Sequence, residues 1–177
     1  MSKKTADNDN KFDEGQHIVY PSHGVGVITG REKQTVAGFD IEVYVISFEQ
    51  DKLILRVPTN KATQVGMRPL SNTKVVTEAM KTLKGKARVK RTMWSRRAQE
   101  YEAKINSGDL ISIAEVVRDL HRGDDQPEQS YSERQLYESA LDRMVREVAA
   151  VEEINHDKAQ EKLTKTLAKR AEANAAA

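Results

Sequence analysis

The spacing of apolar residues changes near residue 70, and this change constrains the fold more than any other feature of the chain. Before it, short runs of β-branched and aromatic residues alternate with turn-forming residues, a pattern typical of antiparallel strands. After it, apolar residues recur at intervals of three and four, which indicates helices. The 177-residue sequence therefore predicts an α+β protein, with a small SH3-like antiparallel β domain at residues 12–70 and an all-α helical bundle at residues 71–177.

Four strands are predicted in the first part, and the last of them is expected at an edge of the sheet. Pro58 ends this strand and has no N–H group to donate to a neighbouring strand. A free edge can accept an extended segment of a partner through main-chain hydrogen bonds. Arg56 interrupts the apolar run, and its charge either protects the edge from aggregation or contacts a partner. The predicted strands are residues 16–20, 25–30, 41–48 and 53–58, with a hairpin turn at Ala37 and Gly38.

Five helices are predicted in the second part. Gly85 ends the first, Ser107 and Gly108 end the second, and Asp109 caps the third. A capping box that starts at Ser130 begins the fourth. The expected ranges are from Ser71 to Gly85, residues 95–106, residues 110–122, from the capping box to about 154, and from about 157 into the Ala-rich end.

The second and third helices, joined at residues 107–109, could form a helix-turn-helix whose second helix enters the major groove. Glu115 and Asp119 on that helix would present negative charge to phosphates. The sequence therefore disfavours this interpretation.

A cluster of positive charge lies at residues 80–97, where eight basic residues occur without an acidic one. Trp94, the only tryptophan, lies within it beside Arg96 and Arg97. Such clusters most often bind phosphate backbones, and an indole can wedge against a base step. Two alternatives stay open, a solvated charged hinge and a Trp94 that is buried in a core.

This charge is local. Residues 1–78 contain ten basic and ten acidic residues, residues 79–99 contain eight and none, and residues 100–177 contain eleven and seventeen. A basic segment between neutral and acidic parts favours a focused contact over indiscriminate coating of nucleic acid.

Other classes of protein are not favoured. No apolar run approaches the roughly 20 residues of a membrane span, and the polar residues 1–11 predict a disordered tail rather than a signal peptide. The lack of cysteine fits a reducing cytoplasm. The four histidines have no metal-site spacing, and neither Gly24-x-Gly26 nor Gly85-Lys86 completes a nucleotide-binding motif. We expect no enzymatic activity, no metal, no cofactor and no membrane association.

Several motifs occur in one order across both parts of the chain: Val19-Tyr20-Pro21-x-His23-Gly24-Val25-Gly26, Arg56-Val57-Pro58, Val65-Gly66-Met67-Arg68, Trp94-Ser95-Arg96-Arg97 and Ser107-Gly108-Asp109, followed by residues 114–120. In these motifs the sequence resembles the bacterial CarD/CdnL family of transcription regulators, from about Phe12 to the last helix.

The resemblance implies a Tudor-like N-terminal domain that binds the β subunit of bacterial RNA polymerase, as in the transcription-repair coupling factor. It also implies that the helical domain contacts promoter DNA near the −10 element, at the upstream edge of the transcription bubble. There a tryptophan wedges into the minor groove and stabilises the open complex. By motif, Trp94 is the wedge, Lys90, Arg96 and Arg97 contact phosphates, and the edge strand with Leu55, Arg56, Val57 and Pro58 faces polymerase.

The sequence departs from the family at some of these positions. Members often have an aromatic and then a basic residue where this chain has Ala98 and Gln99, and some have a basic residue near Gln34. Two other hypotheses remain: a protein–protein adaptor with Trp94 in its core and no DNA contact, and a free-standing nucleic-acid binder. We expect a monomer.

Overall fold

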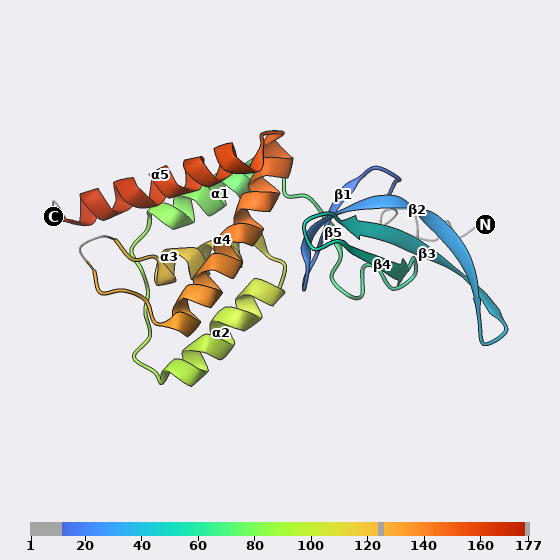
Figure 1. The fold of residues 1–177 in the computed structure, drawn as a ribbon, viewed down its shortest axis with the longest axis horizontal. Coiled ribbons are helices and arrows are strands. Elements are labelled where there is room, and N and C mark those ends of the chain that lie inside the picture. The colour runs from blue at the N-terminus through green and yellow to red at the C-terminus, as the bar shows by residue number, and fades with distance from the viewer. Residues whose placement is uncertain (1–11, 124–125, 176–177) are drawn as a thin grey trace, which may run out of the picture. The chain divides into compact units, whose positions relative to one another are not determined.

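The computed structural model describes residues 12–123 and 126–175, and it divides the chain into two compact units, Met1–Pro69 and Leu70–Ala177. The first is an antiparallel sheet and the second consists of helices (Figure 1). The predicted α+β class is therefore confirmed. The boundary between the units falls one residue before the predicted one. The tail predicted at residues 1–11 lies outside the described residues, as does part of the loop before the fourth helix.

The sheet has five antiparallel strands in the order β4-β3-β2-β1-β5. Pro58 ends β4, and β4 is an edge strand, as predicted. The two-residue β5, which pairs with β1 at the other edge, was not predicted because so short a strand has no periodicity. The strands are β1 (His17–Tyr20), β2 (Gly24–Val36), β3 (Phe39–Phe48), β4 (Leu53–Pro58) and β5 (Arg68–Pro69).

The β2–β3 hairpin is longer than predicted. The expected strand ended at residue 30, whereas β2 continues to Val36, which pairs with Phe39. The predicted turn is confirmed: Ala37 and Gly38 have φ angles of 51° and 81°, as the tight turns of two-residue hairpins require. A register shift between Ile28 and Gly30 bends the ribbon, which was expected from its glycines. Beyond Glu32 and Val43 the hairpin continues as a two-stranded ribbon, because β4 pairs only with residues 43–48 of β3.

One face of the sheet carries a core of aromatic and β-branched residues. Tyr44, Phe48 and Ile46 are at most 2% exposed. Gly26 lies against the Phe48 ring, and a Cβ atom at this position would lie only 2.7 Å from that ring. This close packing, and not phosphate binding, accounts for the glycine.

The second unit contains five helices, as predicted. Their caps agree with the sequence: Asp109 accepts a hydrogen bond from the N–H of Ser112, and Ser130 accepts one from the N–H of Glu133. The predicted third helix was two residues too long, since it ends at Leu120. The helices are α1 (Thr73–Lys84), α2 (Trp94–Asn106), α3 (Leu110–Leu120), α4 (Tyr131–Glu152) and α5 (His156–Ala175).

All five helices contribute to one apolar core, in which Leu83, Val116, Met144 and Leu163 are fully buried. Burial of such side chains contributes about 1.5–3 kcal/mol each. Within the described residues no helix combines the length and the apolar character needed to cross a membrane. The same residues contain no group of three or more His, Asp or Glu placed to hold a metal ion.

Candidate functional site

Trp94 is the first residue of α2. The sequence left open whether its indole is exposed or buried in a core, and the structure shows an intermediate state. The side chain is half-buried and packs against the rim of the helical core. The indole N–H donates a hydrogen bond of 2.9 Å to the hydroxyl of Ser132 in the first turn of α4. Its ring centroid lies 6.2 Å from that of Tyr101, which lies about two turns further along the same face of α2. Trp94 is therefore held in one orientation while part of its ring reaches solvent.

Arg97 lies over the aromatic rings rather than free in solvent. Its guanidinium carbon is 5.4 Å from the centroid of Trp94 and 5.9 Å from that of Tyr101, within the range of cation–π interactions. Its Nε atom is buried and has no hydrogen-bond partner among the described residues. Arg97 thus positions Trp94. Arg96, by contrast, is exposed.

The predicted phosphate contact Lys90 lies in the segment between α1 and α2. Its ammonium is 3.1 Å from Glu100 of α2, and both side chains are at least half exposed. Such an exposed pair contributes at most about 1 kcal/mol and can exchange for a phosphate at little cost. Sequence analysis did not predict the pair.

A buried carboxylate fixes the start of this segment. Asp119 of α3 is 8% exposed and accepts a hydrogen bond of 2.9 Å from the backbone N–H of Arg88. It also pairs with Arg118 at 2.8 Å. Asp119 therefore anchors the basic segment from within. Asp119 does not present to solvent the negative charge that the sequence suggested when a helix-turn-helix was considered.

Two large side chains beside Trp94 are strongly exposed. Met93, the residue before α2, is 74% exposed, and Tyr131, the neighbour of Ser132, is 79% exposed. The sequence pointed to Met93 only through its position next to Trp94, and it gave no signal for Tyr131 or Ser132. Met93, Tyr131, Arg96 and Lys90 are thus exposed apolar and cationic groups in or next to the helix starts that hold Trp94, a composition suited to base and phosphate contacts.

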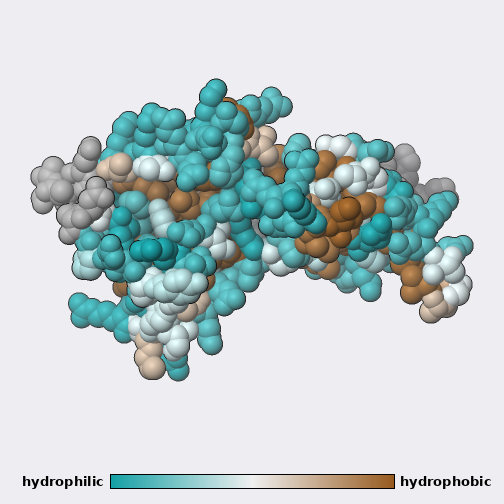
Figure 2. Space-filling view, viewed as in Figure 1, coloured by the Kyte–Doolittle hydropathy of each residue, from teal (hydrophilic) through white to brown (hydrophobic). Residues whose placement is uncertain are grey.

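The β4 edge in the first unit carries the other predicted site residues on two faces. Leu55 and Val57 point toward the apolar core of the sheet. Arg56 is exposed on the opposite face, where Ile54, 57% exposed, was missed by sequence analysis. Figure 2 shows hydrophobic residues at the surface of this unit, including the end of the hairpin, where Val36 and Phe39 are exposed. Partner side chains at this edge would meet Ile54, Arg56 and Pro58.

Arg56 makes an ion pair across the sheet. Its Nε atom lies 3.1 Å from the carboxylate of Glu32 on β2, and both side chains are nearly half exposed. Val45, the direct neighbour of Arg56 on β3, is buried beneath this pair. The pair fixes the direction of the guanidinium and leaves donors free for a partner carboxylate.

Comparison with known proteins gives consistent matches over both units. Residues 12–71 match the family described as CarD-like/TRCF RID domain, and residues 78–164 match CarD, C-terminal domain. The chain is 27% identical over 143 residues to "Putative transcription factor YdeB" of Bacillus subtilis (strain 168), covering 81% of this chain and 94% of that protein. A solved structure, the solution NMR structure of the 72-residue N-terminal domain of Myxococcus xanthus CarD, is 27% identical. It covers 33% of this chain and 79% of that one, with a TM-score of 0.30.

Two domain matches in the expected order, covering most of the chain, define a transcription regulator of the CarD type. The chain belongs to the CarD/CdnL family.

Proposed function

We propose that the protein binds the β subunit of bacterial RNA polymerase through its β4 edge and stabilises the promoter open complex through Trp94. The observation that carries this proposal is the state of the indole: it is held by Ser132, Tyr101 and Arg97, is partly exposed, and lies beside exposed cations. The role is one of binding, without catalysis.

The energetics fit a contact at the edge of the bubble. A wedge that opens an intact base step costs a few kcal/mol, but a step at the bubble edge is already open. Trp94 then stabilises the melted state more than the closed duplex, and only such a difference shifts the equilibrium. A difference of about 1.4 kcal/mol raises the open-complex population about tenfold.

In this proposal each basic residue has its own part. Arg96 contacts phosphate directly, because its side chain is exposed. Lys90 contacts phosphate after leaving Glu100. Arg97 acts mainly through Trp94, over whose ring it lies.

The edge strand supplies the polymerase contact. Backbone groups on the free side of β4 can pair with a strand of the β subunit, and alternating side chains add specificity. Arg56 and Pro58 contribute side chains, and the N–H and C=O groups of Arg56 lie on the free side of β4. Leu55 and Val57 hold the strand in place, since their side chains face the core and their backbone groups face β3.

A second function, as a protein adaptor, is favoured by one observation: the Ser132 bond gives Trp94 a purely structural partner. In that case the indole would only fasten α2 to α4. The two functions predict different effects of removing the indole, because only the wedge predicts a shorter open-complex lifetime.

The test compares Trp94→Ala with Arg56→Ala in promoter assays with polymerase. We expect Trp94→Ala to shorten the open-complex lifetime about tenfold, with capture by the β subunit unchanged. Arg56→Ala should weaken capture. Thermal melting of both variants confirms that they fold. An unchanged lifetime in folded Trp94→Ala would refute the wedge and support the adaptor.

A further inference from the structure

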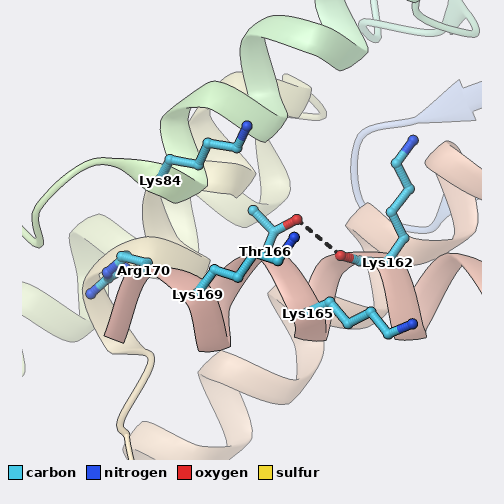
Figure 3. A pocket seen from close by; sticks show the side chains of 6 residues that line it. All are labelled: Lys84, Lys162, Lys165, Thr166, Lys169 and Arg170. Carbon is cyan, nitrogen blue, oxygen red and sulfur yellow. Dashed lines mark hydrogen bonds between the residues drawn. The ribbon is translucent and has the colours of Figure 1, made fainter. Parts of the chain in front are cut away.

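A basic groove lies between the end of α1 and the second half of α5, on helices that do not carry Trp94. Its volume is about 530 Å³, and it is lined by Lys84, Lys162, Lys165, Thr166, Lys169 and Arg170 (Figure 3). Lys84 comes from α1 and the other five from α5 (Figure 3). The two helices pack against each other, while α2 packs against α3 and α4. The groove is therefore a feature separate from the proposed DNA contact.

The positive charge of the groove is only partly balanced. Lys162 pairs with Glu152 at 2.5 Å, and Lys165 pairs with Glu161 at 2.8 Å. Within the part of the chain whose side chains are described, which ends at residue 170, Lys84 and Lys169 have no ion pair or side-chain hydrogen bond. Neither ammonium group thus has an ion-pair partner among these described residues, and the two lysines line one groove from two helices.

Ordinary helix stability explains only part of this arrangement. Lys84 lies in the last turn of α1, where a cation interacts favourably with the helix dipole. Lys162, Lys165 and Lys169, however, follow one another at helical spacing on α5, where like charges repel. The residues from 100 onward are acidic overall, so this cationic surface is local. A bound anion would relieve the repulsion.

The walls of the groove suit a ligand with both an apolar and an anionic part. Lysines form most of the lining, and a lysine side chain offers an apolar methylene stem as well as an ammonium group. Arg170 is held at one end, because it donates a hydrogen bond of 2.8 Å to the carbonyl of Arg118. The volume falls in the range of small-molecule sites, roughly 300–1,000 Å³. Ammonium groups are common phosphate ligands.

We propose that this groove binds a nucleoside polyphosphate, with the phosphates on Lys84 and Lys169 and the nucleoside against the lysine stems. The site would let a small molecule bind and regulate the protein independently of the polymerase and promoter contacts proposed above.

The experiment is isothermal titration calorimetry of the full chain with ATP, AMP, adenosine and inorganic tripolyphosphate. We expect saturable binding of ATP, weaker binding of AMP, and none of adenosine. Tripolyphosphate should bind more weakly than ATP, because it lacks the nucleoside. The double variant Lys84→Gln/Lys169→Gln should weaken ATP binding about tenfold or more.

Lys158→Gln is the control for Lys169→Gln within the double variant, because it removes one lysine charge from α5 outside the groove. It should leave ATP affinity unchanged. An equal loss in the control, or no saturable binding of ATP by the wild type, would overturn the proposal. So would tripolyphosphate binding as tightly as ATP, which would leave no role for a nucleoside. A double variant that loses duplex DNA binding and keeps ATP binding would assign the groove to DNA instead.

Discussion

The indole N–H of Trp94 donates a 2.9 Å hydrogen bond to the hydroxyl of Ser132, a residue 38 positions further along the chain. The bond joins the first turn of α2 to the first turn of α4. Met93 directly precedes α2 and Tyr131 is the first residue of α4, so the bond also brings together the helix ends that carry these two exposed side chains.

Ser132→Ala should release the indole without unfolding the bundle. The loss of one part-exposed hydrogen bond should lower the free energy of unfolding by about 1 kcal/mol or less. We expect iodide to quench Trp94 fluorescence more strongly in the variant, because the ring gains freedom. Trp94 is the only tryptophan, so the signal is specific. Identical quenching in both proteins would mean that Tyr101 and Arg97 hold the ring by themselves.

Arg96 and Arg97 should differ although they are neighbours. Arg96→Gln should lower the salt dependence of promoter binding by about one phosphate contact, since its guanidinium is exposed. Arg97→Gln should instead alter Trp94 fluorescence, because it removes the group above the ring. Salt titrations of affinity and emission spectra of both variants make the comparison. Equal salt slopes with unchanged spectra would contradict the assignment.

Asp119→Ala should loosen the basic segment. It removes the partner of Arg118 and the acceptor of the Arg88 N–H, and loss of a buried ion-pair partner costs about 3–5 kcal/mol. We expect reduced stability in urea and faster trypsin cleavage within residues 86–91. Glu100→Ala, which removes only the exposed partner of Lys90, should cost about 1 kcal/mol or less. Similar losses in both variants would argue against an anchoring role for Asp119.

Tyr137 should make stability depend on pH in the alkaline range. Burial raises the pKa of its hydroxyl from 10.0 to about 12, although Arg170 acts in the opposite direction. The unfolded state then loses its proton first, so the contribution of Tyr137 is complete below pH 10 and is lost as pH rises toward 12. The loss should be roughly 2 to 3 kcal/mol.

Urea unfolding of the wild type and Tyr137→Phe isolates this contribution from the other groups that titrate there. The stability difference between the two proteins should shrink as pH rises through that window. A constant difference would show that the hydroxyl ionises as freely in the folded protein as in the unfolded one.

Local signals in the sequence predicted much of the fold. The caps at Asp109 and Ser130, the Ala37-Gly38 turn and the edge position of Pro58 each depend on residues close together in the chain, so their chemistry can be read directly. The extension of β2 could not be predicted this way. Its charged residues have low strand propensity, and pairing with β3 supplies what propensity lacks.

The candidate site was predictable in its residues but not in their surroundings. The basic cluster and Trp94 stand out in the sequence, whereas Ser132 becomes a partner only when α2 packs near α4. Arg97 looked equivalent to Arg96, and only the helical geometry places it over two rings. The groove likewise depends on Lys84 meeting α5, which no local pattern records.

The unequal lengths of β3 and β4 have a further consequence for local unfolding of the sheet. Residues 33–42 form a ribbon of two strands, with no third strand among the described residues to cooperate with and with Val36 and Phe39 exposed at its end. Such a ribbon can separate and re-form while the rest of the sheet stays intact. Its amide hydrogens should therefore exchange with solvent deuterium much faster than that of Ile46, which lies in a central strand and is fully buried.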